Sequence, residues 1–294
     1  MPTTRSGDRG TVAALAVLAC VAALGIVAIH MFAVGTATGQ RWDADAARIG
    51  AGGGATAAWE ATERLLETIS VASLAMLGVG IMLIALVRRR PWLAVGAGVI
   101  VVGANVSTQV VKAAIDRPDL IAGGPPDPGA FPSGHATVAM SLAMALVLVS
   151  PPLVRWTAAL AGCAYAGGVG IAVIALGWHR PSEVLGAYLM AVAWAALVAA
   201  VLAAAPGARG LTADARRDGR ARARAALAAA LGLAFVALVA VTAAQRVDVL
   251  RIADDRTALT AAALACTAVC AALGVALTAL LQRIGASRRP GRAG

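Results

Sequence analysis

Two short polar clusters in this sequence contain residue types that can perform nucleophilic and acid–base chemistry. They are residues 131–135 (Phe-Pro-Ser-Gly-His) and residues 177–183 (Gly-Trp-His-Arg-Pro-Ser-Glu), and they hold two of the three histidines in the chain. Two apolar stretches, about 134–150 and 156–178, separate the histidines, and each is long enough to cross a bilayer. If one stretch crosses the membrane and the next returns, both histidines emerge on the same side. One site can then be built from two loops.

The first cluster has the residue types of a helix N-terminus that binds an anion. A proline suits a helix entry, Ser133 can cap the first turn, and Gly134 lets an anion approach the backbone closely. The free N–H groups of a first turn and the helix dipole both favour negative charge. The sequence therefore predicts an anion site at the start of this helix, directly beside His135.

The second cluster predicts a histidine that is oriented by a carboxylate. Pro181 marks the start of another helix, because the residue before a proline disfavours the helical conformation. Glu183 then lies in the first turn, from which it can reach back to His179. A carboxylate bonded to one ring nitrogen fixes the tautomer and leaves the other nitrogen free as a nucleophile. A His–Glu pair at a helix start is often only a cap, so the prediction depends on both clusters together.

Lys112 is the only lysine, in a chain that otherwise uses 24 arginines. It ends an apolar stretch at about 91–111, and Asn105, Thr108 and Lys112 are spaced to share one helical face. Lys112 can pair with Asp116 four residues later or extend to the membrane interface. On the same side as two histidine clusters, it is also suited to bind phosphate.

The composition predicts an integral membrane protein with an all-α fold. Hydrophobic residues make up 60% of the chain and charged residues 14%, and the mean hydropathy is +0.80. Only helices or closed barrels satisfy their backbone groups within lipid. Eight stretches are apolar enough to be spanning helices: about 11–36, 68–87, 91–111, 134–150, 156–178, 183–205, 225–244 and 258–281. We expect a polytopic helix bundle with a six-helix core.

The expected organisation has three parts. Residues 1–205 form the core and contain both clusters, residues 206–224 form a basic linker, and residues 225–294 form a two-helix hairpin. A Gly/Ala-rich outer loop occupies about 37–67. The first apolar stretch could instead be a signal peptide, but its length favours a retained helix. The four cysteines all lie in apolar stretches and lack the spacing of a metal site, so we interpret them as small hydrophobic residues.

The distribution of arginines predicts the orientation in the membrane. If the N-terminus is inside, the inner segments hold 16 of the 25 basic residues but only three of the 15 acidic ones. This asymmetry follows the positive-inside rule. It places both termini in the cytoplasm and both clusters on the extracytoplasmic side of the plasma membrane. The same rule explains the net charge of +10, so we expect no nucleic-acid partner.

Together these residues resemble the type 2 phosphatidic acid phosphatase superfamily. Its membrane members remove phosphate from lipid phosphates, and its soluble relatives include vanadium haloperoxidases. The family pattern is a Lys followed by Arg-Pro, then Pro-Ser-Gly-His, then Ser-Arg before His-x-x-x-Asp. The resemblance is clearest over about 68–205.

The resemblance implies a role for each matching residue. His179 is expected to attack phosphorus and become phosphohistidine, with Glu183 in the place of the aspartate that orients it. His135 is expected to protonate the leaving alkoxide and later to help activate water. The groups expected to bind the phosphoryl oxygens are Lys112, Arg117, Ser133 and Gly134. No metal or other cofactor is expected, because cations and backbone N–H groups can carry the developing charge.

The sequence departs from the family pattern in two motifs. Arg117 follows Lys112 by five positions instead of seven, and the Ser-Arg of the third motif aligns with Ala172 and Val173. An unreplaced transition-state donor typically costs about two to three orders of magnitude in rate. Arg180, directly after the predicted nucleophile, is the candidate replacement. The alternative is a catalytically degenerate member that binds a lipid phosphate or acts as a membrane scaffold.

Two other functions are less well supported, and the substrate is open. A transporter is disfavoured because no ionisable residue lies near a predicted midplane. A haloperoxidase is disfavoured because the chain is embedded in the membrane. Phosphatidate and a polyprenyl (isoprenoid) pyrophosphate both fit the expected site. Alanine richness and the preference for arginine hint at a bacterial source, which favours the polyprenyl substrate; the oligomeric state is not predicted.

Overall fold

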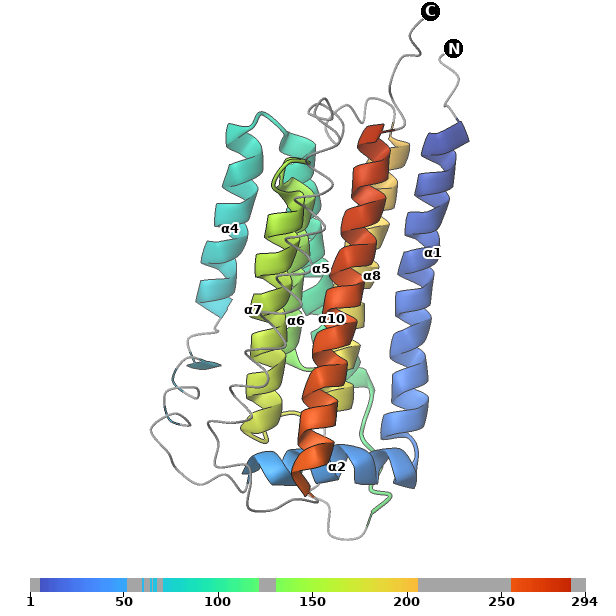
Figure 1. Cartoon of the computed structure of the whole chain (residues 1–294), viewed down its shortest axis with the longest axis vertical. Helices are drawn as coiled ribbons and strands as arrows, with labels where there is room; N and C mark the ends of the chain where they lie inside the picture. Colours follow the sequence, from blue (N-terminus) through green and yellow to red (C-terminus); the bar gives the residue numbers. More distant parts are fainter. Residues whose placement is uncertain are drawn as a thin grey trace, which may run out of the picture.

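The computed structural model describes residues 6–51, 60, 64, 66–67, 71–121, 131–205 and 255–286. Regular structure in these parts is entirely helical, which confirms the predicted all-α polytopic bundle (Figure 1). The elements are α1 (Ser6–Ile29), the π-helical turn η1 (His30–Val34), α2 (Ala37–Ala51), α4 (Val71–Val87), α5 (Pro91–Ala114), α6 (Gly134–Val149), α7 (Arg155–Ala175), α8 (Pro181–Ala204) and α10 (Asp255–Ala286).

The apolar helices coincide with seven of the eight predicted stretches. Five have the length and composition to cross a membrane, namely Arg9–Val34, Pro91–Ala114, Arg155–Ala175, Pro181–Ala204 and Ala263–Arg283. Leu74–Val87 and Gly134–Val149 are shorter apolar helices. The remaining predicted stretch, 225–244, and the predicted linker, 206–224, lie outside the described residues.

Part of the predicted outer loop is a helix. Residues 37–51 form α2, which lies across one end of the bundle, roughly perpendicular to the other helices (Figure 1). From α4 to α8, successive helices run in opposite directions, so α5 and α7 end, and α6 and α8 begin, at this same end. Both polar clusters therefore meet beside α2, at this end of the bundle.

The core of the bundle is built around α6 and α8. α6 contacts α5, α7 and α8, and its residues Ala136, Met140, Met144 and Leu148 are almost fully buried. α10 packs against α7 and α8, and its first half also contacts α2. The Cys266 sulfur lies 3.8 Å from the carbonyl oxygen of Pro181. α10 thus supports the start of α8, where the second cluster lies.

Gly170 on α7 leaves room for side chains that reach it from α8. A Cβ atom at Gly170 would overlap the hydroxyl oxygen of Tyr188 and lie 2.9 Å from a methyl group of Val184. The Tyr188 hydroxyl itself donates a 2.8 Å hydrogen bond to the carbonyl oxygen of Ala166. The Tyr188 hydroxyl therefore cannot move away from Gly170 without losing its hydrogen bond to Ala166.

We expect Gly170→Ala to destabilise the fold by about 1–3 kcal/mol, because overpacking a close helix contact forces side chains and backbone apart. The matched control is Gly168→Ala on the same helix, where an added Cβ meets nothing within 4 Å. Alanine also has the higher helix propensity, so the control should be neutral or stabilising. Thermal unfolding of both variants in detergent measures the difference, and equal midpoints would contradict the prediction.

Candidate active site

The start of α6 is capped as the sequence predicts. The Ser133 hydroxyl accepts a 3.3 Å hydrogen bond from the N–H of Ala136, and Ser133 is fully buried. The Ser133 N–H donates a 2.9 Å hydrogen bond to the carbonyl oxygen of Glu183. The backbones of the two polar clusters are therefore joined directly.

The predicted polar face of α5 lies against α6. The Asn105 amide donates a 3.1 Å hydrogen bond to the Ser141 hydroxyl, and the Thr108 and Thr137 hydroxyls lie 3.0 Å apart. One turn further along α5, the Lys112 ammonium nitrogen is 4.0 Å from the position that a Cβ of Gly134 would occupy. Interhelical hydrogen bonds thus set the register that brings Lys112 over the first residue of α6.

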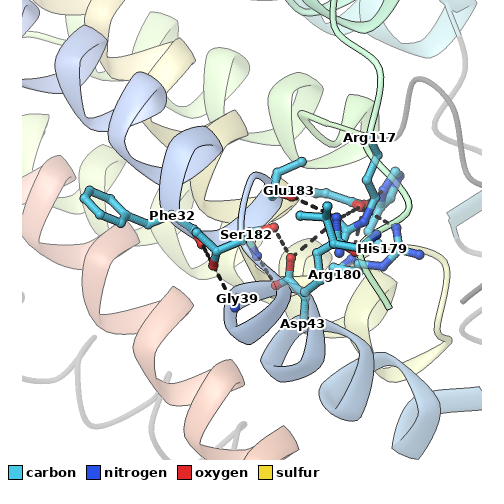
Figure 2. Close-up of polar contacts among 12 residues, drawn as sticks. Phe32, Gly39, Asp43, Arg117, His179, Arg180, Ser182 and Glu183 are labelled. Carbon is cyan, nitrogen blue, oxygen red and sulfur yellow. Dashed lines mark hydrogen bonds and ion pairs between the residues drawn. The ribbon is translucent and has the colours of Figure 1, made fainter. Parts of the chain in front are cut away.

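The predicted contact between His179 and Glu183 is present. Nδ1 of His179 lies 2.7 Å from Oε2 of Glu183, whose side chain is 1% exposed. Gly177 has a φ of 70°, in the left-handed region that favours glycine, and forms the turn that leads from α7 to His179. α8 begins at Pro181, as predicted, so Glu183 lies in its first turn. Figure 2 shows the two side chains meeting at this turn.

Arg180 contacts the same carboxylate as the histidine. Its N–H donates a 3.2 Å hydrogen bond to Oε2 of Glu183, and its guanidinium group lies 3.0 Å from Oε1. Arg117 approaches Oε1 as well, at 3.9 Å. The buried Glu183 carboxylate therefore has the imidazole on one oxygen and two guanidinium groups on the other.

His135 faces the same region from the start of α6. Its ring centroid lies 6.2 Å from that of His179 and 5.6 Å from that of Trp178. The two imidazoles come from different loops, as the alternation of spanning helices requires. A group that is bonded to one imidazole would lie within reach of the other.

Asp43 is a member of this cluster that the sequence analysis missed. It lies on α2, is 5% exposed, and accepts hydrogen bonds from the N–H (3.1 Å) and the hydroxyl group of Ser182. A guanidinium nitrogen of Arg117 lies 3.6 Å from Oδ2 of Asp43. Figure 2 shows Asp43 reaching the cluster from the helix that crosses the bundle end.

Burial disfavours the charged forms of Asp43 and Arg117 and so shifts the pKa of each group. Burial raises the pKa of the Asp43 carboxyl group, while the hydrogen bonds from Ser182 and the charge of Arg117 partly offset this rise. Burial and the nearby charge of Arg180 lower the pKa of Arg117, and Asp43 and Glu183 act in the opposite direction. Each charge in this pair is therefore favoured by the presence of the other.

The cluster contains cationic and N–H groups that can bind an anion. Lys112, Arg117 and Arg180 supply cations, and the first turn of α6 supplies N–H groups. Among the residues that the structure describes, no group of three His, Cys, Asp or Glu side chains is arranged to hold a metal ion. The arrangement fits the binding of a phosphoryl group beside an oriented histidine.

These features define a polytopic helical membrane protein in which two histidines and several cationic side chains gather at one end of the bundle. The family model of the PAP2 superfamily matches residues 74–206. This match confirms, over these residues, the resemblance drawn from the sequence. Searches of curated proteins and of solved structures gave no match. Family and spanning helices together support a membrane phosphatase in general, with a lipid-type substrate.

Proposed function

We propose that the protein hydrolyses a lipid phosphate or a polyprenyl pyrophosphate at the extracytoplasmic face of the membrane, through a phosphohistidine on His179. The observation that carries this proposal is the 2.7 Å contact between His179 Nδ1 and the buried Glu183 carboxylate. A hydrogen on Nδ1, held by Glu183, leaves the lone pair of Nε2 free to attack phosphorus.

The first half of the reaction transfers the phosphoryl group to His179. Nε2 forms a bond to phosphorus while the bond from phosphorus to the leaving oxygen breaks. His135 gives its proton to that oxygen as it leaves, so that the lipid product departs as an alcohol or as a monophosphate. The close approach of the two rings, with centroids 6.2 Å apart, suits this division of roles.

The second half of the reaction releases inorganic phosphate. His135, now unprotonated, takes a proton from a water molecule, and the water oxygen attacks phosphorus as the bond to Nε2 breaks. In both halves of the reaction, Lys112, Arg117 and Arg180 neutralise the charge on the phosphoryl oxygens, and the Ser133 hydroxyl and the Gly134 N–H donate hydrogen bonds to them. Because the site lies at one end of the bundle, the apolar part of the substrate can remain in the bilayer.

The test is the release of phosphate by the detergent-purified protein from phosphatidate and, separately, from a polyprenyl pyrophosphate. We expect turnover of at least one lipid, and none by the His179→Ala variant. The preferred lipid would identify the substrate class. A folded wild-type protein that binds inorganic phosphate but releases none from either lipid would support the degenerate, binding-only alternative and overturn the proposal.

A further inference from the structure

Asp43 is a buried carboxylate that contacts two residues of the candidate active site, Ser182 and Arg117. The Ser182 N–H and hydroxyl group donate to it, and Arg117 pairs with it at 3.6 Å. A carboxylate removed from water is costly unless it is paired and hydrogen-bonded. These contacts meet that requirement, and they join α2 both to the start of α8 and to the segment that follows α5.

Gln40, one turn before Asp43 on α2, holds the same segment at a second point. Its side-chain amide donates to the carbonyl oxygens of Val34 (2.9 Å) and Pro118 (2.5 Å). Its side-chain oxygen lies 3.4 Å from the N–H of Leu120. Residues 115–120 have no helical structure of their own, so α2 supplies contacts on both sides of Pro118 that fix this segment.

This anchoring matters because Arg117 lies between two carboxylates. Its guanidinium nitrogen is 3.6 Å from Asp43 and 3.9 Å from Glu183. If Asp43 lost its charge, Arg117 would be left with Glu183 as its carboxylate partner among these contacts. It would then move toward the group that orients His179 and away from the position between the two carboxylates.

We propose that Asp43 is a positioning residue of the phosphate site: it holds Arg117 away from Glu183 and fixes the start of α8, so that Arg117 is available to a phosphoryl group at His179. The inference rests on the phosphatase function proposed above. It also offers a physical reason why an arginine that comes only five positions after Lys112 can reach the site, since contacts with α2 set the position of Arg117.

The direct test compares Asp43→Asn with Asp45→Asn, which removes the same charge from an exposed position two residues further along α2. Asparagine keeps the size of Asp43 and an oxygen that can accept from Ser182. We expect Asp43→Asn to raise the dissociation constant of inorganic phosphate about tenfold in titration calorimetry, and to raise the KM for the lipid in parallel. Asp45→Asn should change both by less than about twofold.

A double-mutant cycle separates positioning from a general loss of stability. In an Arg117→Gln background, Asp43→Asn should cause no further loss of phosphate affinity, which corresponds to a coupling of about tenfold. An unchanged dissociation constant in Asp43→Asn, or fully additive effects in the cycle, would overturn the inference. The phosphate-binding measurement does not require turnover. A wild-type protein that binds phosphate but is inactive would therefore count against the proposed phosphatase, while the effect of Asp43→Asn on phosphate affinity could still be measured.

Discussion

Replacing His179 with alanine should abolish both turnover and the phosphoenzyme. Replacing His135 should block hydrolysis of the phosphoenzyme but still allow it to form from a substrate whose leaving group needs no proton. The nucleophile has no substitute in the cluster, so we expect the loss in kcat for His179→Ala to exceed about 10⁴-fold. A general acid or base contributes about 10²–10⁴-fold, which sets the expected loss for His135→Asn.

The two histidines can be distinguished with a substrate whose leaving group needs no proton, such as a nitrophenyl phosphate. Attack by His179 can then proceed in the His135→Asn variant, while the activation of water remains impaired. A phosphoryl group that is stable in alkali and labile in acid should accumulate on the protein. His179→Ala should carry none.

His30 provides a matched control because it is the third histidine in the chain. It lies in η1, and its ring centroid is 5.6 Å from that of Phe131. His30→Asn should keep turnover within about threefold of the wild type. Labelling of the His179→Ala protein, or a His135→Asn variant that never accumulates label, would contradict the assigned roles.

The parts of the site that could be predicted are those specified by neighbouring residues. Ser133 caps α6, Pro181 starts α8, and Glu183 reaches His179 from one helical turn away. Each contact spans four positions or fewer, so a local preference for a cap, a helix entry or a turn determines it. The apolar stretches were predictable for a similar reason, because spanning a bilayer constrains length and composition.

The contribution of α2 could not be predicted in the same way. Asp43 and its partner Ser182 are 139 positions apart, and their contact exists only because α2 folds across the end of the bundle. The sequence around Asp43 is rich in glycine and alanine and contains no motif that distinguishes this carboxylate from Asp45. Tertiary packing alone makes one of them buried and leaves the other exposed.

Arg180, the candidate replacement for the arginine that is absent from the third motif, is paired with a carboxylate in this structure. In this structure its guanidinium group lies 3.0 Å from Glu183, and Arg117 lies between Glu183 and Asp43. Two arginines and two carboxylates thus form one network beside His179. A phosphoryl dianion has enough charge to compete with these carboxylates for the arginines. Binding of substrate would then draw the arginines from the carboxylates towards the phosphoryl oxygens.

Arg180→Ala tests whether this arginine replaces the one that is absent from the third motif. We expect kcat to fall about 10²–10³-fold, the typical cost of one lost transition-state donor. The backbone N–H of residue 180 still donates to Glu183 in this variant, so His179 should keep its orientation. Arg180→Lys should recover part of the loss, because it restores the charge but not the planar pair of donors.

The matched control for Arg180→Ala is Arg64→Ala, which removes an exposed arginine that pairs with Glu60 at 3.6 Å. Its effect on kcat should stay within about twofold, because exposed ion pairs contribute little. Phosphoenzyme formation measured in parallel shows whether Arg180 acts before or after attack by His179. If it stabilises the transferring phosphoryl group, formation and hydrolysis should both slow. A fully active Arg180→Ala protein would instead show that Lys112 and Arg117 meet the phosphoryl charge without it.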